Sequence, residues 1–156
     1  GTDNAWIVHD KGSSPLADMA FFVPHMFRMV LFFMIAGLFA RLGIQRLGRR
    51  LMDGLSDLAR QHGVPMRPQG PGLVFHTVIL KPGAAEGPIR DYRDYVKRHD
   101  PARWAHLRRC LLEEGVRAIE RGLWSISLAH RDADIDEALV RAARGFARHA
   151  ATWKPA

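Results

Sequence analysis

The segment Leu73-Val74-Phe75-His76-Thr77-Val78-Ile79-Leu80 decides the fold class of this chain. Its residues are rich in β-branched and aromatic side chains, which is typical of a β-strand. A second run of this kind extends from Leu123 to Ala129. Helical patterns flank both runs, so the sequence predicts an α+β fold in which helices cover a small sheet.

The helix before the first strand is predicted from apolar spacing. Apolar residues recur every three or four positions from Ile44 to Leu58, which gives one face of an amphipathic helix. Gly63 stands where a glycine commonly ends a helix. The Pro/Gly-rich segment 65–72 is then expected to form a turn.

Three further helices are predicted after the first strand. A short charged helix is expected near 91–98, and Asp100 with Pro101 is a typical N-cap and first-turn pair for the next one. The residues of that helix expected to face the core are Trp104, Leu107 and Leu111. A last helix is expected over 132–149. The helices at 44–61 and 132–149 should cover a sheet in which the runs 73–80 and 123–129 are neighbours.

The chain divides into two compositions. Residues 1–42 carry three basic and three acidic groups, whereas residues 43–156 carry the entire net charge of +7. The sequence therefore predicts an apolar helical segment over 1–42 and a separate domain over 43–156. At this length the domain can bury a core without metals or disulfides.

The apolar stretch Met19 to Ala40 has 22 residues, about the length of a membrane-spanning helix. Pro24, His25 and Arg28 interrupt it, and an arginine at mid-membrane costs at least about 2.5–3.5 kcal/mol. The segment lacks the basic start of a signal peptide. Two interpretations stay open: a helix packed on protein, and a membrane-embedded helix. The predicted helix from Ile44 can also begin inside this segment.

Motifs for metal or catalytic chemistry are weak. Cys110 is the single cysteine, which rules out a disulfide framework and predicts that there is no cysteine-based zinc site. Asp132, Asp134 and Asp136 have the first spacings of a calcium loop, but Glu137 and Ala143 replace the required glycine and carboxylate. These three aspartates are therefore expected at a helix start.

The remaining polar candidates are interpreted as structural. His76 and His130 are expected in the core or in a turn, and the eight histidines include no HExxH pattern. Serines 56, 125 and 127 lack a nucleophile-elbow context. Because basic residues alternate with acidic ones, solvated helix faces explain the charge better than nucleic-acid binding. No catalytic, cofactor-binding or metal-binding residue is assigned.

From about 47 to 151 the chain resembles the C-terminal small domain of class III, fold-type I pyridoxal-phosphate aminotransferases, in particular the glutamate-1-semialdehyde aminomutase subgroup. Five stretches carry the resemblance in the family's order: 47–55, 69–76, 89–94, 111–116 and 127–136. The last, Ser127-Leu128-Ala129-His130-Arg131-Asp132-Ala133-Asp134-Ile135-Asp136, matches the family's ending closely.

This resemblance implies a pyridoxal-phosphate enzyme whose cofactor lysine lies in a large domain upstream of this region. Lys11, Lys81, Lys97 and Lys154 do not stand in the family's cofactor-lysine context. Glu120 lies near the family's acidic position, but its spacing to Ser127 differs. The chain is therefore expected not to bind the cofactor alone, and its expected partner is a large domain or a second copy of itself.

Residues 5–42 resemble a helix of the membrane acyltransferases that modify sugars and glucans. Arg28, Met29, Phe32, Phe33 and Gly37 are among the matching residues, and Val30 replaces a usual proline. The two resemblances together suggest a truncated fusion joined near 42–46 and located in the cytoplasm, with membrane contact through 19–42 left open. The alternatives are a membrane-associated acyltransferase-derived fragment and a cofactor-free binding module.

Overall fold

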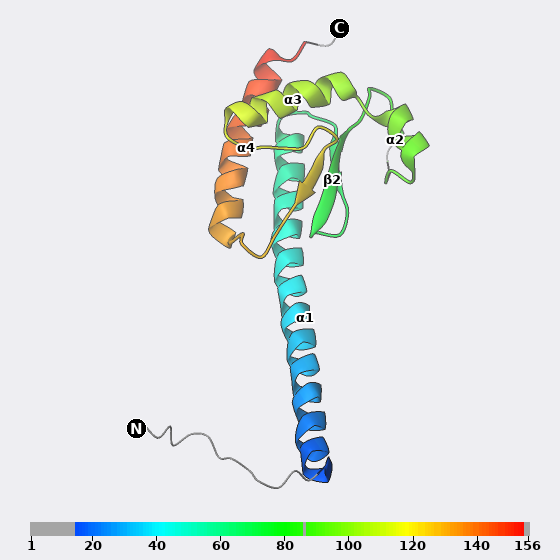
Figure 1. Ribbon diagram of the computed structural model, residues 1–156. Helices are drawn as coiled ribbons and strands as arrows, with labels where there is room; N and C mark the ends of the chain where they lie inside the picture. The colour runs from blue at the N-terminus through cyan, green and yellow to red at the C-terminus, as the bar shows by residue number, and fades with distance from the viewer. Residues whose placement is uncertain (1–14, 86, 155–156) are drawn as a thin grey trace. The chain divides into compact units, whose positions relative to one another are not determined.

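The computed structural model describes residues 15–85 and 87–154, so Lys11 and the start of the acyltransferase-like segment lie outside it. The elements follow one another in the order α1 Pro15–Gln61, β1 Met66–Gln69, β2 Val74–Ile79, α2 Tyr92–Arg98, α3 Pro101–Glu113, β3 Leu123–Ser125 and α4 Asp132–Thr152 (Figure 1). The chain divides into two compact units, of which the first ends at Phe39 and the second begins at Ala40.

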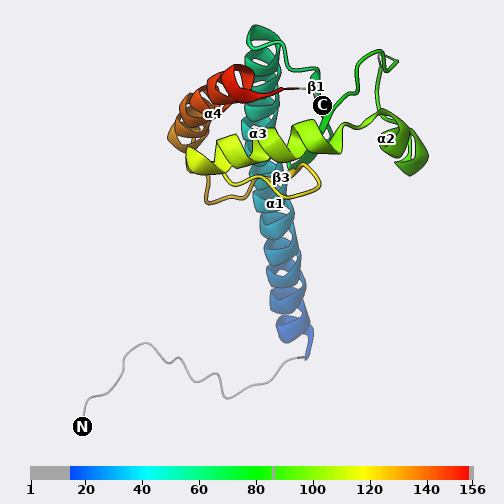
Figure 2. The same cartoon turned by 90° about the horizontal axis from the view of Figure 1, so that it is seen from above.

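The sheet has three antiparallel strands in the order β1-β2-β3. Phe75 of β2 lies opposite Trp124 of β3, and their rings stack with centroids 5.9 Å apart. The prediction that the two β-rich runs are neighbouring strands is therefore confirmed. Together with the surrounding helices, the sheet gives the α+β class that the sequence predicts (Figure 2).

Two details of the sheet differ from the sequence prediction. The segment 65–72 is not entirely a turn, because Met66–Gln69 forms β1 and pairs with β2. Pro68 has no N–H to donate, which an outer strand of a sheet tolerates. In addition, β3 ends at Ser125 instead of Ala129, because residues 127–130 form a turn in which the His130 N–H donates to the Ser127 carbonyl at 3.2 Å.

One glycine shapes the hairpin between β1 and β2, and another, in α1, lets the helix pack against it. Gly70 has φ of +144°, and a Cβ there would lie 2.8 Å from the Phe75 Cα atom, so only glycine fits. A Cβ on Gly48 of α1 would lie 1.8 Å from the Gly72 carbonyl oxygen. Helix and hairpin therefore make direct backbone contact, which any side chain at Gly48 would prevent.

The core of the second unit lies where the sheet meets α1, α3 and α4 (Figures 1 and 2). Leu55 of α1 and Phe146 of α4 are fully buried there. Trp104, Leu107 and Leu111 of α3 are also buried, as predicted. The Asp100 side chain accepts from the Arg103 N–H at 3.0 Å and caps α3, which confirms the predicted helix start.

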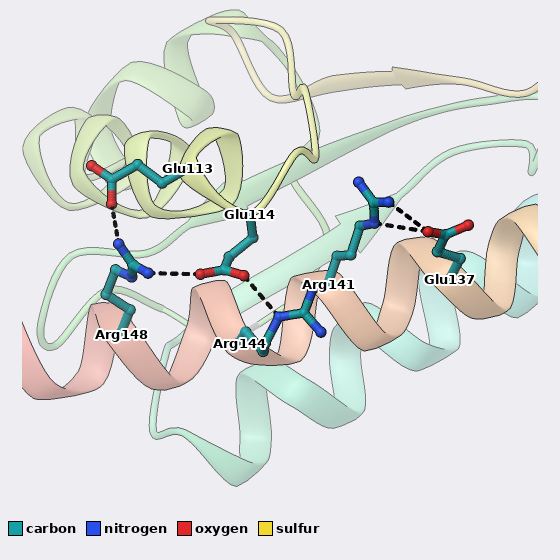
Figure 3. Close-up of polar contacts among 6 residues, drawn as sticks. All are labelled: Glu113, Glu114, Glu137, Arg141, Arg144 and Arg148. Carbon is teal, nitrogen blue, oxygen red and sulfur yellow. Dashed lines mark hydrogen bonds and ion pairs between the residues drawn. The ribbon is translucent and has the colours of Figure 1, made fainter.

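Ion pairs join α4 to the end of α3 (Figure 3). Glu114 accepts hydrogen bonds from Arg144 at 2.7 Å and from Arg148 at 2.8 Å. Arg148 also donates to Glu113 at 2.7 Å. Because the Glu114 side chain is only 14% exposed, the two bonds to Glu114 are less screened by water than ordinary surface pairs.

Helix α1 continues without a break from the apolar segment into the second unit. Within Met29–Leu38 the described side chains are exposed, with Phe32 65% and Met34 68% accessible. The part of α1 from Arg28 to Gln61 is long and apolar enough, by length and composition, to cross a membrane. The bounds of α1 agree with the expectation that one long helix crosses the composition boundary.

Candidate functional site

The described lysines do not fit the cofactor lysine of a pyridoxal-phosphate enzyme. Lys81, Lys97 and Lys154 are all exposed. Lys81 borders a cavity, but it lies in the loop after β2 and lacks the buried surroundings that activate a Schiff-base lysine. None of the described lysines therefore has the surroundings expected of the cofactor lysine.

Tyr95 of α2 lines two clefts. One, of about 350 Å³, reaches from Lys81 and His99 to Trp104 and Arg121. The other, of about 320 Å³, is lined by residues that include His76, Arg90 and Arg121. Both clefts thus combine aromatic rings with arginine side chains, which is a chemistry suited to carboxylate or other anionic groups.

The aromatic rings between these clefts form a stack. His99 lies parallel to Tyr95 with centroids 4.7 Å apart, and His76 meets the same ring edge-on at 5.4 Å. Burial lowers the pKa of both His76 and His99, and burial also raises the pKa of the Tyr95 phenol. All three rings are therefore neutral near pH 7, so the cations of the clefts carry the attraction for an anion.

A second cluster lies between α3 and α4 and consists of His106, Cys110 and His149. The nitrogen and sulfur atoms that these residues offer lie within 4.8 Å of one another. The Nδ1 atoms of His106 and His149 are 2.9 Å apart, and the Cys110 Sγ atom is 3.8 Å from the His106 Nδ1 atom. We call this group the His-Cys cluster.

Hydrogen bonds fix the protons of the His-Cys cluster. Arg103 donates from Nε to the His149 Nε2 atom at 3.5 Å, and a guanidinium only donates. The proton of neutral His149 is therefore on Nδ1, from which it donates to His106 Nδ1. His106 then carries its proton on Nε2, 3.5 Å from the Thr152 Oγ1 atom. The Thr152 hydroxyl in turn donates to the Arg148 carbonyl at 2.7 Å.

The cluster keeps its members uncharged. Burial lowers the pKa of His149 to about 4, helped by the neighbouring His106 and Arg103. Burial also lowers the pKa of His106 and raises the pKa of the Cys110 thiol. The Trp153 ring stacks on His149 with centroids 5.7 Å apart and shields one side of the pair. The cluster therefore presents two neutral imidazoles and a thiol near pH 7.

The sequence does not predict the His-Cys cluster. A single cysteine excludes a site built from several cysteines, whereas the structure places two histidines beside Cys110. The His106–Cys110 spacing of four residues, which puts both side chains on one helix face, is the available signal. The contribution of His149 from a distant helix could not be identified from spacing.

The residues singled out in the sequence lie elsewhere. Asp132 begins α4 and pairs with Arg46 and Arg50, which agrees with the expectation of helix-start carboxylates. The His130 Nδ1 atom lies 3.0 Å from the Ser127 Oγ atom, in an exposed turn. Glu120 is exposed, and its carbonyl accepts from the Trp104 indole N–H. Glu120, Ser127 and Asp132 therefore each have different partners.

No family model matches the sequence. The chain is 32% identical over 102 residues to glutamate-1-semialdehyde 2,1-aminomutase of Symbiobacterium thermophilum, a match that spans 64% of this chain and 22% of that protein. The chain thus spans less than a quarter of the length of this curated relative.

Solved transaminase structures resemble the chain over a similar share of their length. A β-phenylalanine aminotransferase from Variovorax paradoxus matches with a TM-score of 0.57 and 26% identity, over 70% of this chain and 24% of that one. A transaminase with bound pyridoxal phosphate matches with a TM-score of 0.56 and 23% identity, over 72% and 24%. An omega-transaminase from Sphaerobacter thermophilus matches with a TM-score of 0.55 and 15% identity, over 70% and 24%.

Proposed function

Because this chain carries a fragment of the class III pyridoxal-phosphate transaminase fold, we propose that its second unit serves as the small domain of an aminotransferase or aminomutase. The observation that carries the proposal is the 102-residue match to an aminomutase at 32% identity. The required partner is a large domain that holds the cofactor, on this or another polypeptide. We place this unit in the cytoplasm.

The 156-residue polypeptide by itself is expected to be catalytically silent. Transamination needs a lysine that holds the cofactor as a Schiff base and a carboxylate at the ring nitrogen. The described lysines are exposed and stand apart from such a site. Purified chain mixed with pyridoxal phosphate should therefore show neither an internal-aldimine absorbance band nor amino-donor turnover. A stoichiometric band that disappears when one lysine is replaced would contradict this expectation.

A chimera tests the small-domain role itself. Residues 47–151 of this chain replace the matching part of the Symbiobacterium aminomutase, and the rest of that enzyme is expected to supply the cofactor lysine. The chimera is expected to bind the cofactor and to turn over substrate above the level of the truncated large domain. A matched chimera with Leu55→Ala, which empties a fully buried core position, should lose this gain. A folded chimera with no gain over the truncated enzyme would contradict the role.

The clefts beside Tyr95 suggest where substrate specificity resides. Arg121 borders both clefts and could bind a substrate carboxylate between the aromatic rings. In the active chimera, Arg121→Gln should raise KM for an acidic substrate more than it lowers kcat. Arg117→Gln, on an exposed residue of the same loop outside the residues lining either cleft, is the matched control. Equal effects of both substitutions would contradict the assignment.

A second candidate function, membrane attachment through 19–42, is favoured by the exposed apolar side chains of Met29–Leu38. Contiguous exposed apolar surface marks contacts with membranes or partners. The full chain is expected to float with phospholipid vesicles, and a variant with Phe32→Ser and Phe33→Ser is expected to float less. Deleting residues 1–42 should improve solubility. If the deletion variant aggregates while the full chain stays soluble, the segment belongs to the core instead.

A further inference from the structure

We propose that the His-Cys cluster between α3 and α4 is a binding site for one transition-metal ion of the zinc class. The donors are the Nδ1 atoms of His106 and His149 and the Sγ atom of Cys110. Nothing in the transaminase likeness requires this site, so it stands independently of the proposed function.

The distances within the cluster suit such an ion. Zinc binds imidazole nitrogen at about 2.0–2.1 Å and thiolate sulfur at about 2.3 Å, so tetrahedral donors lie roughly 3–4 Å apart. The two Nδ1 atoms are separated by 2.9 Å, and the Sγ atom is 3.8 Å from the nearer one. All three donor atoms lie within 4.8 Å of one another, so side-chain rotations can bring them to bonding distance from one ion.

The surrounding helices hold the donors in place. His106 and Cys110 occupy one face of α3, while His149 comes from α4. A Cβ on Gly145 would lie 3.3 Å from the Cys110 carbonyl oxygen, so the glycine lets the two helices approach closely. The bonds from Arg148 to Glu113 and Glu114 tie the same helices together (Figure 3). The site is thus supported by packing and by ion pairs.

The donor set selects the class of metal. A thiolate with two imidazoles prefers zinc, cobalt or copper to magnesium or calcium, which bind oxygen. Each histidine offers one ring nitrogen to the cluster, and imidazole nitrogen is a common ligand of these metals. The His106 Nε2–H faces the Thr152 hydroxyl, an outer partner of the kind that orients a ligating histidine. Because His106 is half-buried, a water molecule can reach the fourth coordination position.

Binding must rearrange two protons. The Cys110 thiol releases its proton to solvent when the metal–sulfur bond forms. The Nδ1 proton of His149 moves through solvent to Nε2, where Arg103 now donates. Arg103 must therefore swing away, and its positive charge opposes the ion together with those of Arg109 and Arg148. Removing the Arg103 guanidinium should consequently strengthen binding.

A cobalt titration of the full chain tests the site. Co²⁺ is expected to bind with one-to-one stoichiometry, to give a thiolate-to-cobalt charge-transfer band in the near ultraviolet, and to be displaced by Zn²⁺. Cys110→Ser should abolish this band, and His106→Gln should weaken binding by at least about 100-fold. His62→Gln, on a half-buried histidine that stacks on Phe146 outside the cluster, should leave the titration unchanged.

Arg103→Gln supplies a test in the opposite direction, since it should bind Co²⁺ more tightly than the wild type. Far-UV circular dichroism checks that each variant is folded. The proposal is overturned if the folded wild type gives no thiolate band, if Cys110→Ser keeps it, or if binding by His106→Gln and His62→Gln weakens equally.

Discussion

Two stretches of helix α1 differ in the exposure of their apolar side chains. In Met29–Leu38 apolar residues occupy successive positions on every side of the helix, and the large side chains are exposed. From Leu47 to Ala59 apolar residues recur every four positions, and these are buried in the core of the second unit. A helix that is apolar all round needs an apolar environment on all sides, whereas an amphipathic helix needs one partner face. Periodicity therefore determines which kind of partner each stretch requires.

The largest expected difference between the two stretches is the loss of stability when a leucine is truncated to alanine. Leu55→Ala empties a fully buried position and should lower the free energy of unfolding by about 3–5 kcal/mol. Leu38→Ala removes the same atoms from an exposed position and should leave the unfolding of the second unit unchanged. Urea unfolding followed by the fluorescence of the buried Trp104 and Trp124 measures both. Equal losses would show that the apolar stretch is part of the same core.

A glycine pair sharpens the same comparison. Gly48→Ala places a Cβ 1.8 Å from the Gly72 carbonyl oxygen, so the hairpin must shift, at a cost of about 1–3 kcal/mol. Gly37→Ala meets no atom of the described residues within 4 Å and should favour the helix by up to about 1 kcal/mol. Thermal unfolding midpoints distinguish them. A Gly48→Ala protein with an unchanged midpoint would show that α1 and the hairpin do not need this contact.

Ion pairs between α3 and α4 stabilise the unit whose core buries the second stretch of α1. Hydrogen bonds from Arg144, and then the charge of Arg148, lower the pKa of Glu114 below its ordinary value of 4.5. This stabilisation is present above about pH 4.5 and is lost as the pH falls through the lower folded-state pKa. Glu114→Gln should therefore destabilise the protein near pH 7, with the difference from wild type shrinking in acid.

Glu137→Gln is the control for this experiment, because Glu137 is exposed and pairs with Arg141 of its own helix. Its effect should be smaller at every pH. Urea midpoints measured between pH 7 and pH 3 provide the comparison. A pH-independent difference for Glu114→Gln would exclude the ion pairs as its cause.

The smallest effect is expected where the amphipathic stretch begins. Asp132 pairs with Arg46 and Arg50, but its side chain is 48% exposed. Exposed pairs contribute little and are screened by salt. Asp132→Asn should therefore lower the urea midpoint slightly in dilute buffer and not at all in molar salt. A shift that persists in salt would indicate a structural role of Asp132 beyond charge.

Local patterns predicted most of the fold. The N-cap pair Asp100 and Pro101, the run 73–80 and the helical spacing after Ile44 each depend on near neighbours in the sequence, so a single sequence contains them. Strand β1 is not predicted, because Pro68 and the following Gly70 and Gly72 favour a turn. Pairing with β2 overrides that local preference. The length of β3 depends on how far it pairs with β2, and local composition does not predict the extent of that pairing.

The candidate sites were less predictable for the same reason. The clefts beside Tyr95 bring together residues from β2, α2 and the loop before β3. The His-Cys cluster needs the register of α4 against α3 to place His149. Within the His-Cys cluster, the four-residue spacing of His106 and Cys110 was visible, and a pair of ligands on one helix does not by itself define a site.

The position of Pro68 affects how copies of this chain can associate. It lies in β1, one of the two outer strands of the described sheet, and the opposite outer strand, β3, has three residues. A proline and a short strand both hinder the addition of further strands to a sheet edge. Self-association should therefore proceed through helix surfaces and not through cross-β growth. Aggregates of this chain are expected to keep a helical circular dichroism spectrum and not to increase the fluorescence of amyloid-binding dyes.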